Sequence, residues 1–455
     1  MEYKWKVMFT VWIGSFMATL DASIVNVALP TLTAYFKTDI TTIEWVVMAY
    51  LLTIISLLLS IGRISDMFGR KPIFASGLAI FTIGSFLCAV SGSEGQLILY
   101  RVVQGIGAAM LMATGVAIVT HAFPPRERGK AMGLIGTVVA IGSMAGPVAG
   151  GFLIENVGWQ SIFYINIPVG IFGTAMAIIV LGKEETTSGQ TFDISGALSL
   201  AIGLVALLLA LSQGQEFGWR SSYIILLFIL SVIFFIIFII VENRARHPVM
   251  ELRHFTNRPF AAASISALIS FIAMYNVILL MPFFLQDELG YSPEDVGIAF
   301  LAVPLVMSVV APFSGWLSDR TNSYVLSSIG VGIASISILW LGFLSTSSGS
   351  IDVVLRLALL GLGMGLFQAP NNSIIMGSLS KEQLGIAAGT LGTMRNTGMV
   401  MGVAVSGAVF SSRYDYYGGV GASFLPAFKD TYTVSAIICG IAMLTSLVRS
   451  KKREE

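Results

Sequence analysis

Charged side chains are scarce in this chain of 455 residues, because Asp, Glu, Lys and Arg together make up only 11% of it. A water-soluble domain carries about 25% charged residues, so this chain cannot cover its own surface with polar groups. Hydrophobic residues make up 55% of the chain, and lipid must therefore be its main surroundings. The composition excludes an ordinary soluble enzyme or binding domain.

Residues that form disulfides or hold metals are also scarce. Cys88 and Cys439 lie far apart inside apolar segments, and the three histidines fall in predicted loops, so neither type has a metal-ligand or disulfide spacing. The net charge of +1 gives no general attraction to nucleic acid. No Walker-type glycine loop and no nucleophile–base arrangement is present. We expect no metal, no cofactor, no nucleic-acid partner and no enzymatic activity.

Long apolar runs dominate what is present. They are about 20 residues long, which suits α-helices that cross a bilayer better than the shorter alternating strands of a barrel. Fourteen candidate spans lie at approximately 5–29, 43–64, 72–92, 97–120, 131–153, 161–182, 194–213, 222–242, 259–286, 293–314, 324–344, 352–376, 386–411 and 431–448. The chain is therefore predicted to be an all-α, multi-pass protein of the cell (inner or cytoplasmic) membrane.

Loop charge predicts the orientation of these spans. Cytoplasmic loops collect Lys and Arg, and with the N-terminus inside, most of the 26 basic residues fall on the inner side. The basic residues left for the outer side are Lys37, Arg220, Arg413 and Lys429. Both termini are therefore predicted to be cytoplasmic, in agreement with an even number of spans.

An internal repeat divides the chain. The loop Gly62–Asp66 after the second span resembles Gly315–Arg320 after the tenth, and each is followed at similar spacing by a Gly-rich span that begins with Arg101 or Arg356. Such duplicated units are typical of transporters, whose binding sites lie between the halves. The expected domains are a six-helix bundle (1–182), two inserted transmembrane helices with linkers (183–258) and a second six-helix bundle (259–455).

An acidic residue inside the first span, Asp21, breaks its apolar pattern. An aspartate at a helix centre costs roughly 2.5 to 3.5 kcal/mol on insertion scales, and such residues usually face a polar path. We interpret Asp21 as a proton-coupling site; the alternative is a structural acid paired with a buried arginine. The second half has Met274–Asn276 at the equivalent place, so mid-membrane charge chemistry appears only in the first half.

Arg101 is the expected partner of Asp21. A buried arginine stays charged and needs an anion, and Asp21 is the acid placed well inside the first bundle. Desolvation favours a neutral acid, whereas a neighbouring arginine favours the carboxylate. Such a pair is a two-state element that a proton can bias.

Several motifs resemble those of one known family, the major facilitator superfamily. The segment GRISDMFGRK (62–71) resembles its loop 2–3 signature, RVVQGIG (101–107) its fourth-span motif, and GSMAGPVAGG (142–151) its antiporter motif. The segments LDASIVNVALP (20–30) and WQSIFYINIP (159–168) are similar to the fourteen-span drug:proton antiporter branch. The resemblance implies two six-helix bundles related by a pseudo-two-fold axis, plus two inserted helices.

The resemblance also implies roles for two motifs. A conformational latch on the cytoplasmic side would comprise Gly62, Asp66, Gly69, Arg70, Asp319 and Arg320. Gly62 and Gly69 are expected to permit the tight turn between spans 2 and 3; the alternative is that the basic residues there only set topology. A bending segment that limits leak would comprise Gly142, Gly146, Pro147, Gly150 and Gly151. A proline removes one backbone hydrogen bond and small neighbours allow close helix packing.

Polar side chains elsewhere in the spans are candidates for substrate contact, because polar groups in hydrocarbon need partners. They are Asn26, Gln104, Asn166, Asn276, Phe284, Gln286, Arg356, Gln368, Asn372, Arg395 and Asn396. Arg356 and Arg395 have no obvious acid in their half. They are expected to contact an anionic substrate, acids at span ends, or carbonyl groups.

The sequence thus predicts a proton-coupled multidrug efflux antiporter that works by alternating access and as a monomer. Its partners would be protons, membrane lipid and small lipophilic substrates of cationic or amphipathic character. One alternative is an exporter of a single endogenous solute, lipid or natural product. A second is a membrane receptor or sensor, although a receptor would not need duplicated gates.

Overall fold

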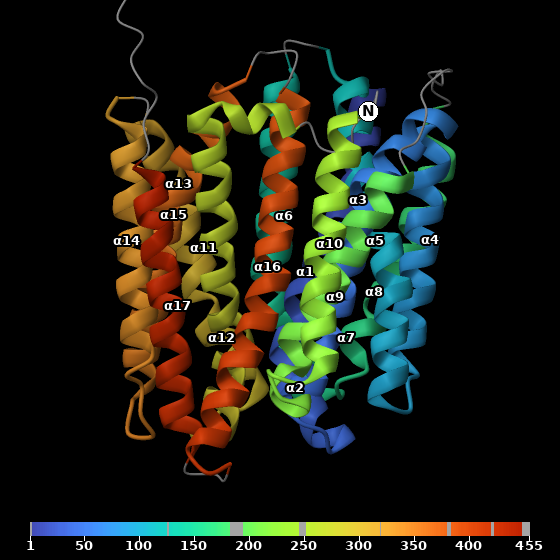
Figure 1. Cartoon of the computed structure of the whole chain (residues 1–455). Helices are drawn as coiled ribbons and strands as arrows, with labels where there is room; N and C mark the ends of the chain where they lie inside the picture. Colours follow the sequence, from blue (N-terminus) through green and yellow to red (C-terminus); the bar gives the residue numbers. More distant parts are fainter. Residues whose placement is uncertain are drawn as a thin grey trace, which may run out of the picture. The chain divides into compact units, whose positions relative to one another are not determined.

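The computed structural model describes residues 2–124, 127–182, 194–244, 252–318, 320–379, 384–419 and 423–447. In these residues all regular secondary structure is helical. The all-α fold predicted from composition is therefore confirmed, and the helices are shown in Figure 1.

The helices follow the predicted spans along the chain. The first half contains α1 (Tyr3–Phe36), α2 (Ile40–Ile43), α3 (Trp45–Phe68), α4 (Arg70–Ala89), α5 (Glu94–Ala122), α6 (Arg128–Asn156), α7 (Ser161–Tyr164) and α8 (Asn166–Val180). The middle contains α9 (Ile194–Phe217) and α10 (Ser222–Arg244). The second half contains η1 (Leu252–Thr256), α11 (Arg258–Phe283), η2 (Phe284–Glu288), α12 (Pro293–Phe300), α13 (Ala302–Ser318), α14 (Ser323–Leu341), α15 (Ser350–Gly377), α16 (Leu384–Tyr416) and α17 (Phe424–Ser446).

Thirteen helical stretches of the described chain are long and apolar enough to cross a membrane. They coincide with thirteen of the fourteen predicted spans. The remaining one, at 386–411, coincides with α16, whose 33 residues give a length of about 50 Å. That length exceeds the hydrocarbon core of about 30 Å, but α16 is less apolar than the other helices, so the fourteenth crossing stays a prediction.

Proline interrupts several spans. The breaks at Ile165, between α7 and α8, and at Leu301, between α12 and α13, each lie three residues before a proline, Pro168 or Pro304. Proline has no N–H to donate to the carbonyl four residues earlier, so the helical ladder is interrupted there. Pro282 lies near the end of α11, and the π-helical turn η2 follows it directly. Three predicted spans are therefore pairs of helical pieces.

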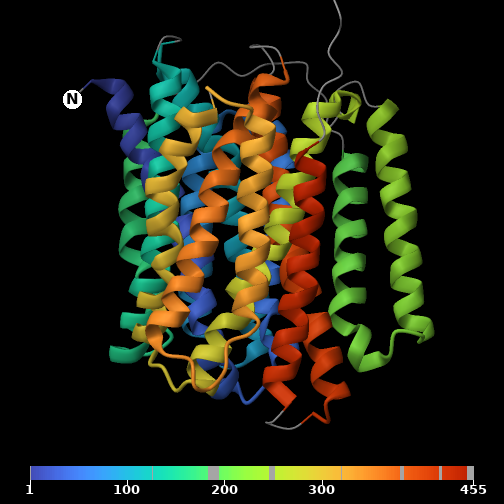
Figure 2. The ribbon, with the colours of Figure 1, turned by 90° about the vertical axis from the view of Figure 1, so that its left-hand side faces the viewer.

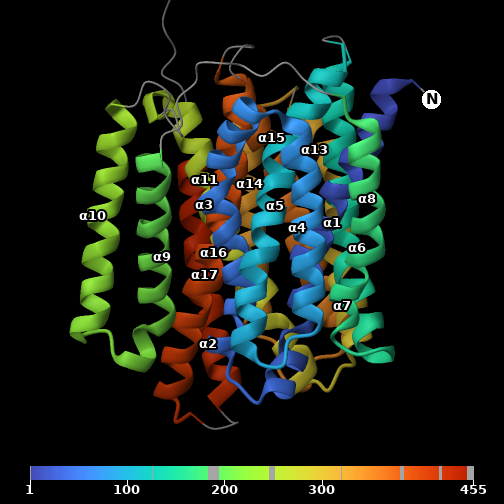
Figure 3. The same cartoon turned by 90° about the vertical axis from the view of Figure 1, so that its right-hand side faces the viewer.

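The chain forms two compact units. The first comprises Met1–Leu207, Leu227–Val249 and Tyr291–Ile298, and the second comprises Leu208–Leu226, Met250–Gly290 and Ala299–Glu455. Within the first unit α5 packs between α3 and α4, as Figure 3 shows, while α1 packs on α6 and α8 on α4. Within the second unit the same neighbours recur, because α15 packs on α13 and α14, α11 on α16, and α17 on α14. The packing thus reproduces the repeat seen in the sequence, whereas the predicted domain boundaries stay predictions.

Glycines set the closest helix contacts in the first unit. A Cβ on Gly105 of α5 would lie 2.9 Å from the carbonyl oxygen of Tyr50 in α3. A Cβ on Gly107 would lie 2.4 Å from the backbone nitrogen of Phe81 in α4. Because neither space admits a side chain, these two glycines hold α5 between its neighbours.

The second unit uses the same device. A Cβ on Gly361 of α15 would lie 2.4 Å from the carbonyl oxygen of Val303 in α13, and one on Gly363 would lie 2.5 Å from the nitrogen of Ala334 in α14. These glycines follow Arg356 much as Gly105 and Gly107 follow Arg101. The repeated motif therefore has one shared structural purpose, the close packing of three helices.

The two middle helices, α9 and α10, lie side by side as a hairpin (Figure 2). Ser231 of α10 donates a hydrogen bond of 2.9 Å from its hydroxyl to the carbonyl oxygen of Gly203 in α9. Near the connecting turn, Trp219 fills the space beside Gly214. The α10 side chains are largely exposed and apolar, as expected for a helix that faces lipid.

Candidate functional site

Asp21 lies in the middle of α1 with no exposed surface. One carboxylate oxygen, Oδ2, accepts a hydrogen bond of 2.5 Å from Arg101 Nη1. The other, Oδ1, accepts hydrogen bonds of 2.7 Å from Gln104 Nε2 and 3.1 Å from Asn166 Nδ2. The predicted Asp21–Arg101 pair is thus present in the structure, and two amides complete the donor set. We call Asp21, Ser85, Arg101, Gln104 and Asn166 the carboxylate cluster.

Arg101 is fully buried and held from several sides. Its Nε donates to the carbonyl oxygen of Val46 over 2.9 Å, and its Nη1 also donates to Gln104 Oε1 over 2.6 Å. The guanidinium lies 4.0 Å from the ring centroid of Tyr50, within the range of a cation–π contact. Arg101 therefore keeps partners on α3 and α5 even without the carboxylate.

Gln104 connects Asp21 to α4. Its Nε2 donates to Ser85 Oγ over 2.8 Å as well as to Asp21, and Cys88 Sγ lies 3.7 Å from its Oε1. A Cβ on Gly84 would lie 2.7 Å from the Gln104 backbone, so the absence of a side chain at Gly84 allows this close approach. From α3 and α4, the titratable groups near the Asp21–Arg101 pair are the phenol of Tyr50 and the thiol of Cys88.

Asn166 is the first residue of α8, directly after the break at Ile165. Its side chain is buried, and Asp21 is its one hydrogen-bond partner among the described residues. Close packing fixes the helix that follows, because a Cβ on Gly173 would lie 2.8 Å from Ile13 of α1. Gly170 likewise has no room for a side chain beside Thr82 of α4. Asn166 therefore links the Asp21 carboxylate to the start of α8.

The glycines of the antiporter motif lie against the α1 segment that carries Asp21. A Cβ on Gly142 would lie 2.3 Å from Thr19 Oγ1, one on Gly146 would fall within the Ser23 side chain, and one on Gly150 would lie 2.7 Å from Ile24. Gly142, Gly146 and Gly150 are spaced four residues apart, so they line one side of α6. This α6 glycine face brings the α6 backbone directly onto α1 one turn to either side of Asp21.

The remaining two residues of that motif meet the start of α12, whose residues Tyr291–Ile298 belong to the first unit. A Cβ on Gly151 would lie 2.2 Å from the carbonyl oxygen of Pro293, and the Pro147 carbonyl leaves no room for a side chain on Gly297. The N–H of Glu294 donates to the Glu155 carboxylate over 3.2 Å. One motif thus contacts α1 on one side and α12 on another.

The expected latch is described only in part. The side chain of Asp66 and the whole of Asp319 lie outside the described residues. Gly69 has a φ of +94°, which suits glycine, and joins α3 directly to α4. The expectation that Gly62 helps this turn is wrong, because Gly62 lies within α3, six residues before its end. In the second half, Arg320 stacks on Trp316, with its guanidinium 4.1 Å from the ring centroid.

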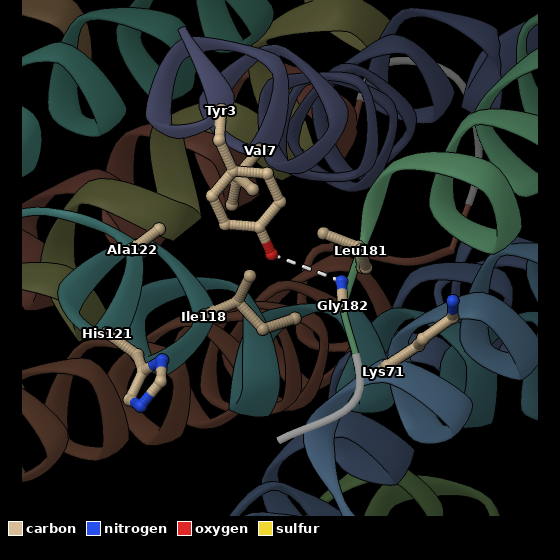
Figure 4. A pocket seen from close by; sticks show the side chains of 8 residues that line it. All are labelled: Tyr3, Val7, Lys71, Ile118, His121, Ala122, Leu181 and Gly182. Atoms are coloured by element: carbon tan, nitrogen blue, oxygen red, sulfur yellow. Dashed lines mark hydrogen bonds between the residues drawn. The ribbon is translucent and has the colours of Figure 1, made fainter.

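A small cavity of about 10 Å³ lies where α1, α4, α5 and the end of α8 meet (Figure 4). Lys71 and His121 line it, and the Tyr3 hydroxyl accepts a hydrogen bond of 3.1 Å from the Gly182 N–H. Lys71 Nζ donates to the Ile178 carbonyl over 2.8 Å, at the end of α8. The volume suits one water molecule and is far too small for a drug-sized ligand.

In the second unit, Asn276 and Arg356 have protein partners. Asn276 Nδ2 donates to Thr431 O over 3.0 Å and to Ser435 Oγ, and its Oδ1 accepts from Ser406 Oγ over 2.8 Å. The position equivalent to Asp21 thus fastens α11 to α16 and α17.

Arg356 forms a two-point ion pair with Asp352, over 2.9 and 2.6 Å, and donates to the Trp340 carbonyl. Of the expected partners, an acid at the span end and a carbonyl are therefore present.

The other substrate candidates occupy varied surroundings. Asn26 donates to carbonyl groups of its own helix, at Ala22 and Ser23. Phe284 is buried and stacks on Phe428 at 4.9 Å. The polar candidates that are only partly buried are Gln286, Gln368, Asn372 and Arg395. Asn396 is buried, and its Nδ2 has no hydrogen-bond partner among the described residues.

Sequence reasoning missed three members of the Asp21 surroundings: Ser85, Tyr50 and the Val46 carbonyl. Ser85 looks like an ordinary small residue in a span, and no sequence pattern assigns a backbone carbonyl to a distant arginine. Gln104 and Asn166 were expected to contact substrate, whereas the structure places both amides on Asp21. In the sequence, Gln104 and Asn166 stood out because each is a polar residue within an otherwise apolar span.

Comparison with known proteins identifies the family. The sequence model of the Major Facilitator Superfamily matches residues 11–195 and 194–403. The chain belongs to this superfamily. It is therefore a multi-pass membrane transporter rather than an enzyme, and in bacteria such a protein lies in the cell membrane.

Individual relatives agree with this assignment. The chain is 34% identical over 459 residues to the riboflavin transporter RibZ of Clostridioides difficile (strain 630), covering 100% of this chain and 99% of RibZ. It is 32% identical to the multidrug resistance protein Stp of Mycobacterium tuberculosis (strain CDC 1551 / Oshkosh), covering 88% of this chain and 74% of Stp. The crystal structure of a peptide transporter, POT, matches with a TM-score of 0.70 at 15% identity, covering 96% and 93% of the two chains. This last similarity concerns the fold alone.

Proposed function

We propose that this superfamily member is a proton-coupled antiporter that exports lipophilic compounds from the cytoplasm by alternating access. The observation that carries the proposal is the carboxylate of Asp21, buried at mid-span and bound by three donor groups from α5 and α8. An intramembrane acid with several partners is a functional site by default.

The cluster has a built-in response to a proton. An ionised carboxylate only accepts hydrogen bonds, and all three of its partners donate. A proton on Oδ1, which already accepts two hydrogen bonds, takes one of its lone pairs and leaves one N–H without a partner. Leaving a buried donor unsatisfied costs about 1–3 kcal/mol, which is enough to change the balance between two packings.

Asn166 is the group that such a proton would release. Arg101 binds the other oxygen, Oδ2, and Gln104 keeps Ser85 as an acceptor, whereas Asn166 has no second acceptor among the described residues. Because α8 begins at Asn166 after a proline-induced break, loss of this bond would free the start of α8 from α1. The α6 glycine face packs on the same α1 segment, so a change there would also reach the antiporter motif.

The driving force is sufficient for accumulation. One proton that moves inward down a potential of 100 mV releases about 2.3 kcal/mol, before any pH gradient is added. In this scheme Asp66 and Arg70 on one side, and Asp319 and Arg320 on the other, would form the cytoplasmic latch. Gly146 and Pro147 would form the bending segment, and the transporter would work as a monomer.

A second candidate is transport of one defined solute, riboflavin. It is favoured by the similarity to RibZ, which extends over the full length of both proteins, whereas Stp is matched over 74% of its length. The carboxylate cluster suits either candidate, because it concerns coupling rather than substrate.

Purified protein in proteoliposomes tests both candidates. Ethidium, fluorescein and riboflavin would be followed across vesicles with an imposed pH gradient, with Asp21→Asn and empty vesicles as controls. Proton-driven movement of the dyes supports multidrug antiport, and movement of riboflavin alone supports the second candidate. Flux that persists unchanged after the proton gradient is collapsed contradicts proton coupling. Absence of flux with proton-independent ligand binding would favour a sensor.

A further inference from the structure

Arg395 is a cation inside α16 that has no anion as a partner among the residues that the structure describes. It is the twelfth residue of the helix, about 17 Å from its start. The side chain is half-buried and its Nε is buried. The guanidinium makes no hydrogen bond or ion pair with any residue that the structure describes.

Other span arginines are neutralised. Arg101 pairs with Asp21 at 2.5 Å, and Arg356 pairs with Asp352 at 2.6 Å. Arg395 therefore adds one uncompensated positive charge to the second unit. A half-buried charge without a partner is unfavourable, and arginine cannot remove that cost by losing its proton.

The position of Arg395 is fixed by the packing of its helix. Gly398 and Gly402 lie three and seven residues further on, so they share a face of α16 with Arg395. A Cβ on Gly398 would lie 2.5 Å from Leu268 O, and one on Gly402 would lie 2.6 Å from Ile272 O. That face therefore meets the α11 backbone directly, and the register of the two helices is set.

Tyr275 of α11 interacts electrostatically with this guanidinium, and its side chain is 7% exposed. The adjacent Asn396 also has a buried donor, Nδ2, without an acceptor in the described part of the chain. This turn of α16 thus presents N–H donors and a positive charge, with no matching anion among the described residues.

We propose that Arg395 binds an acceptor-rich head group of the transported substrate: a carboxylate, a phenolate or a pair of carbonyl oxygens. The planar guanidinium binds such groups with two parallel hydrogen bonds. The site favours anionic or neutral carbonyl-rich compounds over cations, which differs from the expectation of cationic substrates drawn from the family resemblance.

This proposal rests on the proposed transport function but concerns binding, so its test needs no gradient. Fluorescein and rhodamine 123 share a xanthene core and differ in charge, one anionic and one cationic. Binding of each to purified protein in detergent would be followed by fluorescence polarisation. The variants are Arg395→Gln, Arg395→Lys and, as a matched control, Arg413→Gln, which changes an arginine of the same helix that contacts Asp430 at 3.4 Å.

We expect Arg395→Gln to weaken fluorescein binding ten- to hundredfold, as the loss of charge-assisted hydrogen bonds implies. Arg395→Lys should fall between wild type and Arg395→Gln, because lysine keeps the charge but not the two-point geometry. Rhodamine 123 binding should stay equal or improve, and Arg413→Gln should match wild type for both dyes.

Two results would overturn the proposal. One is fluorescein binding unchanged in Arg395→Gln, and the other is an equal loss for both dyes, which indicates a structural role only. If Arg395→Gln does not fold, the test uses Arg395→Lys and the relative affinity of the wild type for the two dyes. Tighter binding of rhodamine 123 than of fluorescein by the wild type would contradict the proposed site. A failure of proton coupling would appear separately, as gradient-independent flux in the wild-type vesicles.

Discussion

Removing the Asn166 side chain should weaken the attachment of α8 to α1. Asn166 donates one of the three hydrogen bonds that the Asp21 carboxylate accepts, and it has no other acceptor among the described residues. In Asn166→Ala the buried carboxylate loses this donor, and the start of α8 loses its bond to Asp21. Both losses should lower the free energy of unfolding, and the looser start of α8 should also weaken the coupling between proton and substrate movement.

The size of the effect follows from the geometry. A hydrogen bond to a charged group contributes about 1.5–3 kcal/mol. At 3.1 Å the Asn166 bond is the longest of the carboxylate's three, which places it at the lower end. The free energy of unfolding should therefore fall by about 1.5 kcal/mol in Asn166→Ala.

The assay is thermal unfolding of the purified protein, together with gradient-driven flux of a transported probe in proteoliposomes. Asn156→Ala is a matched control, since the Asn156 side chain is exposed and donates to the Phe152 carbonyl of its own helix. This control should match the wild type in both measurements. Unchanged stability together with unchanged coupled flux in Asn166→Ala would refute the role of Asn166.

Further predictions concern the rest of the site. Asp21→Asn should abolish gradient-driven export in proteoliposomes while the protein still inserts, and full coupled export would contradict its role. Gly146→Ala should destabilise the first unit by about 1–3 kcal/mol in thermal unfolding, because its Cβ would collide with Ser23; adding Ser23→Gly should recover part of the loss, and no recovery would mean that the contact is not the cause. Asp66→Ala should increase thiol-reagent labelling of a cysteine introduced on the cytoplasmic side, since Cys88 and Cys439 are buried, and unchanged labelling would count against a latch.

Much of the fold was predictable because its cause is local in the sequence. The lipid environment requires every backbone polar group in a span to bond internally, so apolar runs of about 20 residues must be helices. The internal repeat could also be predicted from the sequence, because the glycines after Arg101 and Arg356 allow the same close helix contacts in both units. The position of Gly62 within α3 could not be predicted, because a glycine in a short loop and a glycine near a helix end look alike in sequence.

The Asp21–Arg101 pair was predictable for a similar reason. A buried charge must find an opposite one, and the first bundle offers few acids inside its spans. The second half shows the limit of this reasoning. Arg356 pairs with an acid four residues away on its own helix, whereas Arg395 has no acidic partner among the described residues. Charge balance alone does not predict which arginine finds a partner.

By itself, the sequence determined that the chain is an all-helical membrane transporter with a lone acid in the middle of its first span, because those properties follow from composition, hydrophobic length and repeated motifs. Only the tertiary structure decided which donors surround that acid. Gln104 and Asn166 reach Asp21 from different helices because Gly84, Gly170 and Gly173 let backbones approach closely. Such contacts join residues up to 145 positions apart, and their geometry depends on packing that no local pattern records.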